Sequence, residues 1–180
     1  MQRLPAFLAP SLLAVSLAFS GAAVAQTAHN SAAPINFGAD HIELQDKANR
    51  ALLSGNVVVK QAEMTLNSAR MTVAYTGQVV DGSPQVSRLD AAGSVVVTRP
   101  DQTARSNFAV YDLNKRVVTM LGAVTLIQQG NTVNGGRLTI NLDTGRAVID
   151  GSSVGGKAGT TTTSSGGRVS GTFSVPKRNN

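Results

Sequence analysis

Residues that could carry out chemistry are sparse in this sequence, and their spacing assembles no catalytic group. The chain has no cysteine and two histidines, His29 and His41. His41 alternates with Ile42 in a predicted strand, and its neighbour Asp40 points to the opposite face, so Asp40, His41 and Glu43 do not converge on one ion. The sequence therefore predicts neither a nucleophilic catalytic system nor a metal site.

The acidic residues and the glycines also lack the spacing of an enzyme site. Most of the ten Asp and Glu residues fall at predicted turns, where Asp favours the local geometry. A glycosidase-type carboxylate pair stays possible, because strands bring distant residues together, but nothing singles one out. No GxxxxGK[ST] loop occurs, so nucleotide hydrolysis is excluded and no cofactor is predicted.

The formal charge of +6 is concentrated outside the central part of the chain. Residues 26–150 contain eleven Lys and Arg against ten Asp and Glu, a net charge of +1. With so few aromatic residues interleaved, this segment does not resemble a nucleic-acid-binding surface. The basic excess lies in the tail, which is either a solvated end or a contact for an anionic membrane surface.

The first 25 residues have the features of an export signal. Arg3 supplies the positive end, Leu4 to Phe19 is almost continuously apolar, and Ala23-Val24-Ala25 is a small-x-small cleavage site. Retention as a membrane anchor is the alternative, although the apolar run is short for a span. We expect a periplasmic protein cleaved after Ala25, without disulfides or a lipid-modified cysteine.

The elements that could position a site come from a repeated β pattern. The unit in residues 52–75 begins with a glycine turn and a valine run at Gly55-Asn56-Val57, and continues with apolar residues at alternate positions. It returns at Gly93 and at Gly122. Period-two alternation predicts strands with one buried face, and the recurrence predicts stacked units that share one core. The fold class is therefore all-β.

Composition divides the chain into four parts. Residues 1–25 are the signal, 26–34 a flexible leader, 35–150 one β domain, and 151–180 a disordered tail. In the tail, 17 of the 22 residues from Gly151 to Thr172 are Gly, Ser or Thr, with no apolar periodicity.

The alternating apolar stripe is the strongest functional feature. It is rich in Val, Leu, Met and Ile and poor in large aromatic residues. Such a stripe is either an ordinary core or the lining of a groove for acyl chains, in which each buried methylene contributes roughly 0.8 kcal/mol. The sequence leaves these two interpretations open.

Several segments together resemble the LptA/OstA-like family of periplasmic lipopolysaccharide-transport proteins. They are PINFGAD at 34–40, GNVVVKQ at 55–61, MTLNSARMTV at 64–73, SNFAVYDL at 106–113 and LGAVTLIQQGNTVNGGRLTI at 121–140. The resemblance covers residues 35–150 and implies a twisted antiparallel β-jelly roll, open along an edge, with an apolar interior groove.

The resemblance also implies which residues line that groove. Ile35, Phe37, Tyr111, Leu113 and Val96 follow from the family's motifs, although the internal repeat would turn Val95 and Val97 inward in place of Val96. The remaining predicted lining residues follow from alternation and are Val57, Val59, Met64, Leu66, Val73, Val124, Leu126, Leu138 and Ile140.

Finally, the resemblance implies a non-enzymatic bridge between the two membranes of the envelope. Lipid A acyl chains of lipopolysaccharide would travel inside, and edge strands would pair with inner-membrane LptC-like and outer-membrane LptD-like proteins, or head to tail with further copies. An exported adhesin or structural β array, or a β-helical enzyme acting on polysaccharide, are the alternatives.

Overall fold

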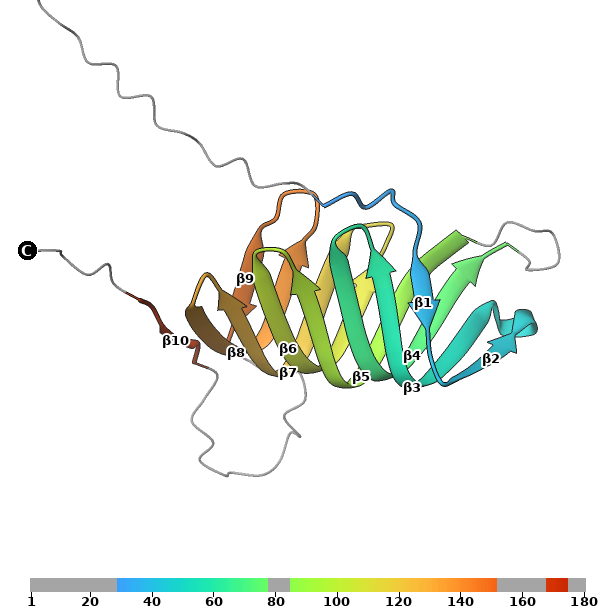
Figure 1. The fold of residues 1–180 in the computed structure, drawn as a ribbon, viewed down its shortest axis with the longest axis horizontal. Coiled ribbons are helices and arrows are strands. Elements are labelled where there is room, and N and C mark those ends of the chain that lie inside the picture. Colours follow the sequence, from blue (N-terminus) through green and yellow to red (C-terminus); the bar gives the residue numbers. More distant parts are fainter. Residues whose placement is uncertain (1–28, 78–84, 152–167, 175–180) are drawn as a thin grey trace, which may run out of the picture.

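The computed structural model of the chain describes residues 29–77, 85–151 and 168–174, and it is a single antiparallel sheet of ten strands (Figure 1). A short 3-10 turn, η1 (Asp46–Ala48), joins β2 to β3. The strands are β1 (Asn36–Gly38), β2 (His41–Gln45), β3 (Arg50–Gln61), β4 (Met64–Thr76), β5 (Gln85–Arg99), β6 (Gln102–Asp112), β7 (Val117–Gln128), β8 (Asn131–Asn141), β9 (Ala147–Asp150) and β10 (Ser170–Thr172).

At each end of the sheet, two short strands share the outer edge of one long strand. The long strands β3 to β8 pair in sequence order. On the outer edge of β3, β2 pairs with residues 50–54 and β1 pairs with residues 58–60. On the outer edge of β8, β9 pairs with residues 137–140 and β10 with residues 132–134. The sheet therefore ends in two half-length strands at both sides.

The repeated glycines lie within strands, which differs from their prediction as turns between strands. Gly55 and Asn56 have φ angles of 76° and 45°, and the pairs at Gly93 and Gly122 repeat this conformation. The pairing register shifts at the same places. Two successive residues with positive φ form a bulge that bends a strand without ending it. The short strands predicted on either side of each glycine are thus single long strands.

Bending at the bulges folds the sheet over on itself, so that the turns gather along one edge (Figure 1). One row of turns joins β3 to β4, β5 to β6 and β7 to β8, and the other joins β6 to β7 and β8 to β9. We call the line where the two rows meet the seam. The fold is the twisted antiparallel jelly roll that was predicted, not closed into a barrel.

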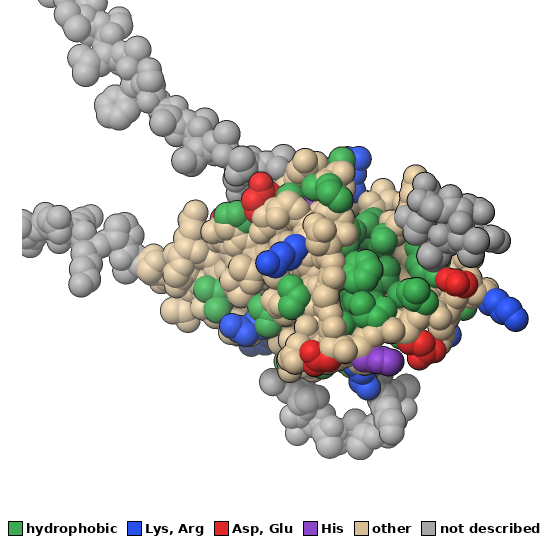
Figure 2. All heavy atoms as spheres, turned by 45° about the vertical axis from the view of Figure 1, so that its right-hand side comes forward, with side chains coloured by type: hydrophobic (Ala, Val, Ile, Leu, Met, Phe, Trp, Pro, Cys, Tyr) green, Lys and Arg blue, Asp and Glu red, His purple; other side chains and the backbone are tan. Residues whose placement is uncertain are grey.

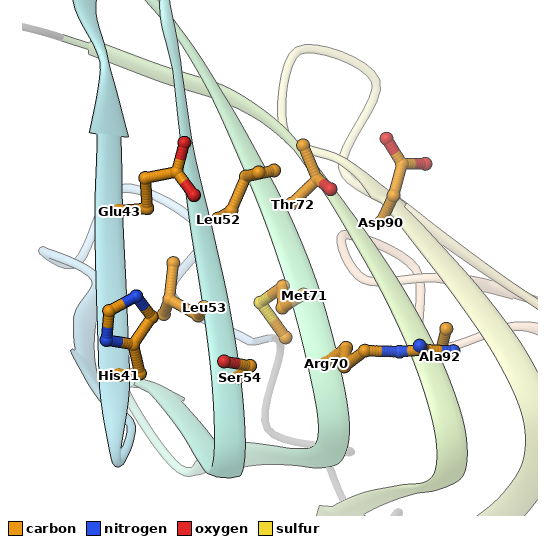
Figure 3. A pocket seen from close by; sticks show the side chains of 10 residues that line it. All are labelled: His41, Glu43, Leu52, Leu53, Ser54, Arg70, Met71, Thr72, Asp90 and Ala92. Carbon is orange, nitrogen blue, oxygen red and sulfur yellow. The ribbon is translucent and has the colours of Figure 1, made fainter.

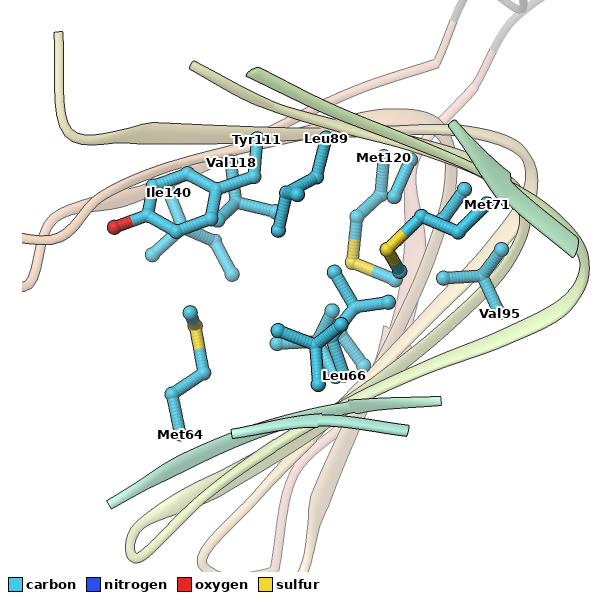
Figure 4. Close-up of a cluster of buried hydrophobic side chains, with 14 of the residues drawn as sticks. Met64, Leu66, Met71, Leu89, Val95, Tyr111, Val118, Met120 and Ile140 are labelled. Atoms are coloured by element: carbon cyan, nitrogen blue, oxygen red, sulfur yellow. The ribbon is translucent and has the colours of Figure 1, made fainter. Parts of the chain in front are cut away.

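The inner face of the folded sheet is the hydrophobic core. Side chains from the two arms point toward one another, with Tyr111, Leu89 and Ile140 on one side and Met64 and Leu66 on the other (Figure 4). Tyr111 and Leu66 are each 1% exposed and Leu138 is 0% exposed. Within the described residues, no helix is long and apolar enough to cross a membrane.

Two segments outside the predicted domain have structure. Residues 29–34, predicted as part of a flexible leader, lie against the end of β3, where His29 is buried. Residues 170–172, in the segment predicted as a disordered tail, form β10. In both places polar contacts with the sheet fix the chain although the local sequence has no apolar periodicity.

Candidate functional site

The apolar interior is the candidate functional site, and most of the predicted lining residues lie in it. They occupy alternate positions of β3, β4, β6, β7 and β8 and none is more than 7% exposed. Those predicted residues are Val57, Val59, Met64, Leu66, Val73, Tyr111, Val124, Leu126, Leu138 and Ile140.

The prediction for Val96 is wrong. Val95 and Val97 are 0% and 2% exposed and point inward, whereas Val96 is half-buried on the outer face, opposite Asn67 and Arg105. The bulge at Gly93 fixes the register of the valine run, because a shift of one residue turns every side chain to the other face.

The three remaining predicted residues lie at the margins of the interior. Ile35 and Leu113 are partly buried against the core. Phe37 is paired with Val59 and so lies on the same face of the sheet, but it is 47% exposed because β1 is an end strand. Its exposure follows from its position at the end of the sheet.

An apolar patch therefore marks the end of the sheet formed by β1 and β2. Ile42 is paired with Leu53 and Leu44 with Ala51, so both face the interior side, yet they are 41% and 59% exposed. Figure 2 shows hydrophobic side chains gathered at this end of the molecule. Contiguous exposed apolar surface is typical of an interaction or ligand site.

Buried polar side chains hold the two rows of turns together at the seam. The hydroxyl of Tyr111 donates a 2.6 Å hydrogen bond to Oε1 of Gln61, and Nε2 of His29 lies 3.3 Å from the same oxygen. The amide nitrogen of Gln61 donates to the carbonyl oxygens of Ser31 and Ala33, both at 3.0 Å. We call these contacts the seam clasp.

The clasp lies in a desolvated environment. Burial raises the pKa of Tyr111, and the hydrogen bond to Gln61 acts in the opposite direction. Gln61 is 2% exposed and its amide and carbonyl groups both have partners. A buried polar network of this kind is stable only while its members stay paired.

A second group of polar residues points inward farther along the same rim. Arg99 and Gln102 are paired at the turn between β5 and β6 and are 8% and 6% exposed. Nη1 of Arg99 is buried without a hydrogen-bond partner. Among the acidic residues that the structure describes, none lies within ion-pair distance of Arg99. As far as the structure describes the chain, the rim thus holds a buried cation without a counter-charge.

Sequence analysis missed several members of the interior. Alternation within the predicted strands could have identified Leu89, Val118, Met120 and Leu142, which are at most 1% exposed. The same alternation, continued by one step, would have turned Gln61 inward after Val57 and Val59, and Arg99 inward after Val95 and Val97. Their polar character concealed them.

A hollow of about 360 Å³ on the outer face is a separate feature. Glu43, Thr72 and Asp90 form one row across neighbouring strands, and His41 and Arg70 belong to the next row (Figure 3). Asp90 is already engaged by Arg88 at 2.7 Å. No three His, Asp or Glu side chains in the described part of the chain are grouped to hold a metal ion.

Comparison with protein families identifies this fold. The family model described as "LptA/(LptD N-terminal domain) LPS transport protein" matches residues 37–146, which is more than half of the chain. The chain belongs to this family. The match spans β1 to β8, apart from the first residue of β1, and so includes the bulged strands and most of the interior.

A solved structure shares the fold of this chain, and a curated relative shares part of its sequence. The structure of LptH from Pseudomonas aeruginosa, described as the LptA homologous periplasmic component of the lipopolysaccharide transport device, has a TM-score of 0.66 and 21% identity, and the match covers 82% of this chain and 99% of that chain. At this identity the likeness shows the fold. The protein R00383 of Rhizobium meliloti, described as uncharacterized, is 29% identical over 121 residues, and the match covers 65% of each protein. The chain thus spans less than two thirds of that relative's length.

Proposed function

We propose that this protein is a periplasmic carrier of lipopolysaccharide that shields the acyl chains of lipid A in its interior and catalyses no reaction. The observation that carries the proposal is the inner face itself, which combines an almost wholly apolar surface with a seam closed by side-chain contacts. Membership of a lipopolysaccharide-transport family supports the choice of cargo.

Loading requires the two arms to separate along the seam, since the interior is filled by the protein's own side chains. An acyl chain of about twelve carbons would gain on the order of 10 kcal/mol on leaving water, from roughly 0.8 kcal/mol per methylene. This gain must offset the broken seam clasp and the lost packing. Met64, Met71 and Met120 line the interior, and their flexible side chains can repack around a ligand.

The ends of the sheet support the bridging part of the proposal. Among the described strands, β1 and β2 pair only with β3, and their other main-chain edges lie beside the exposed Phe37, Ile42 and Leu44. Edge strands of this kind add further strands by main-chain pairing. LptC-like and LptD-like proteins, or a second copy of the chain, would extend the interior into a longer apolar track. The apolar N-terminal segment, with its cleavage site after Ala25, would direct the protein to the periplasm.

Photocrosslinking from neighbouring positions of β6 tests the proposal. A benzoylphenylalanine at Tyr111 faces the interior, whereas the same group at Val110 is on the outer face. After incubation with lipopolysaccharide and irradiation, we expect a crosslinked product from position 111 and not from position 110. Equal crosslinking at both positions would indicate a surface contact, and no crosslinking at either position would indicate that no lipid is taken up. Both results contradict an interior carrier.

A further inference from the structure

The far edge of β8 is completed by a strand from the C-terminal tail. β9 covers one half of this edge, and β10 covers the other by pairing Ser170 with Asn134, Gly171 with Val133 and Thr172 with Thr132. Figure 1 shows β10 beside the lower part of β8. Nineteen residues, 151–169, separate β10 from β9. The tail thus returns to fill one half of the end strand.

The contacts that hold β10 are few. All three of its residues are exposed, and β10 runs into Phe173, which is 67% exposed. Beyond the ladder, the backbone N–H of Ser174 donates to Oδ1 of Asn131 at 2.9 Å, and its hydroxyl lies 3.3 Å from the same oxygen. β10 therefore buries little apolar surface and depends mainly on main-chain pairing.

Gly171 is the residue of β10 that faces the inner side of the sheet. Paired residues of antiparallel strands point to the same side, so Gly171 lies over Val133, which is itself paired with inward-facing Leu126. A glycine presents no side chain there. A Cβ at Gly171 would lie 3.1 Å from the carbonyl oxygen of Thr132 and 3.4 Å from the side chains of Val133 and Phe173, so a larger residue fits only if these neighbours shift. An incoming strand with its own register and apolar residues could bury Val133 more completely.

The opposite end of the same sheet offers such a strand. β1 and β2 lie on β3 on either side of its bulge at Gly55, and β10 and β9 divide the edge of β8 in a similar way, on either side of Gly135 and Gly136. Phe37 and Ile42 on β1 and β2 are exposed and point to the inner side. The two ends of one molecule are therefore complementary in strand pairing and in apolar surface.

We propose that β10 is a self-donated cap, which occupies the edge of β8 at Thr132–Asn134 in competition with the β1–β2 edge of a second copy of this chain. The inference rests on the proposed bridging function and adds its regulation. Removal of the cap exposes the terminal edge of β8 and permits head-to-tail association.

The size of the effect follows from competition within one chain. A segment tethered by a linker of this length acts at an effective concentration in the millimolar range, so even weak pairing keeps the edge covered. When only a tenth of the molecules have a free edge, the apparent dissociation constant for a partner is about tenfold higher than for an uncapped protein.

Two variants test the cap. One ends after Gly151. The other carries Gly171→Pro and Thr172→Pro in the full chain. Neighbouring residues of a strand point their N–H groups to opposite sides, so one of the two prolines removes an N–H that faces β8. Ser164→Pro with Ser165→Pro, in the same tail, is the matched control. Sedimentation velocity measures self-association, and hydrogen exchange of residues 132–134 reports whether β10 has left the edge.

We expect both cap variants to self-associate about tenfold more tightly than the unmodified chain and the proline control. We also expect a peptide of residues 168–175, added in excess, to reverse the gain. The inference is overturned if the unmodified chain, the two cap variants and the proline control all associate equally, or if none of them associates detectably. It is also overturned by tighter association of variants whose exchange at residues 132–134, measured at a dilution at which they are monomeric, is as slow as in the unmodified chain. Lipid crosslinking at position 111 is measured on the same proteins, and its loss would instead contradict the carrier function.

Discussion

Replacing Tyr111 by phenylalanine tests whether the seam clasp controls opening of the interior. The substitution removes a hydroxyl that is 2.6 Å from Oε1 of Gln61 and leaves the ring in place. Tyr111 and Gln61 are 1% and 2% exposed, so water cannot replace the lost partner without entering the seam. After the change, Oε1 of Gln61 keeps only the 3.3 Å approach of His29 among the described contacts.

The expected destabilisation is about 1–3 kcal/mol, the usual range when a buried acceptor loses its donor. Urea denaturation followed by fluorescence or circular dichroism measures the change in the free energy of unfolding. If the bond also breaks whenever the arms separate, the same energy shifts the opening equilibrium. A change of 1.4 kcal/mol corresponds to a factor of about ten. We therefore expect lipid A to load about tenfold faster at limiting concentration.

Tyr75→Phe is the matched control, because the Tyr75 hydroxyl donates to Oδ1 of Asp46 at 3.1 Å and to no member of the seam clasp. This variant should lose less stability and load lipid at the unmodified rate. Loading is measured by stopped-flow fluorescence with labelled lipid A. If Tyr111→Phe unfolds at the unmodified denaturant concentration, or if the two variants accelerate loading equally, the clasp does not gate the interior.

Three further predictions concern the sheet. Arg99→Met should raise the free energy of unfolding by about 1–3 kcal/mol, because it removes a buried guanidinium with an unpaired Nη1. Arg105→Met, on the outer face, should change the free energy of unfolding little. Denaturant titration of both variants measures the difference. Gly55→Ala should destabilise the protein by roughly 1 kcal/mol or more, because Gly55 has a φ of 76° and an added Cβ would collide with Asp40. Gly38→Ala is the control and should not destabilise it, because the space around Gly38 is open. Equal shifts in melting temperature for the two variants would contradict this. The backbone N–H of Lys115 donates to Asp112 and lowers the pKa of its carboxyl. Asp112 therefore stabilises the fold above the ordinary Asp pKa, and this contribution is lost as the pH falls through the lowered value. Asp112→Asn should flatten the acid limb of a stability–pH profile and leave the neutral-pH limb parallel to that of the unmodified protein.

The β class and the inward residues of most strands could be predicted because alternation is a local property. Val57, Val59, Leu138 and Ile140 lie on the predicted face because each has its neighbours two positions away. The role of the glycines could not be predicted in the same way. A Gly-X pair favours a turn and a bulge equally well, and the choice depends on whether a partner strand continues past it, which is a long-range property.

The same distinction explains where the structure differs from the predictions. Val96 is the middle of three consecutive valines, which show no alternation between apolar and polar residues, so only the bulge at Gly93 sets its register. Phe37 follows the inward pattern but is exposed, since its burial depends on a neighbour beyond β1. The pairing of residues 170–172 with β8 joins segments nearly forty residues apart, and a Gly/Ser/Thr-rich sequence carries no apolar signal for it. Local pattern predicts which face a residue occupies, and position in the sheet decides whether that face is covered.

The distribution of polar residues along the seam bears on how a carrier of this kind would hold its cargo. On the rim formed by β3, β5 and β6 the last inward positions are Gln61, Arg99 and Gln102, all buried. The facing rim contributes the Tyr111 ring, and Leu142 lies farther along it. Unpaired polar groups at the margin of an apolar core lower its stability, so a sequence selected only for packing would avoid them. An amphiphile whose chains lie inside and whose polar head lies at the seam would satisfy these groups when the clasp opens. Arg99, whose unpaired Nη1 weakens the closed, empty interior, is thus suited to stabilise the loaded one.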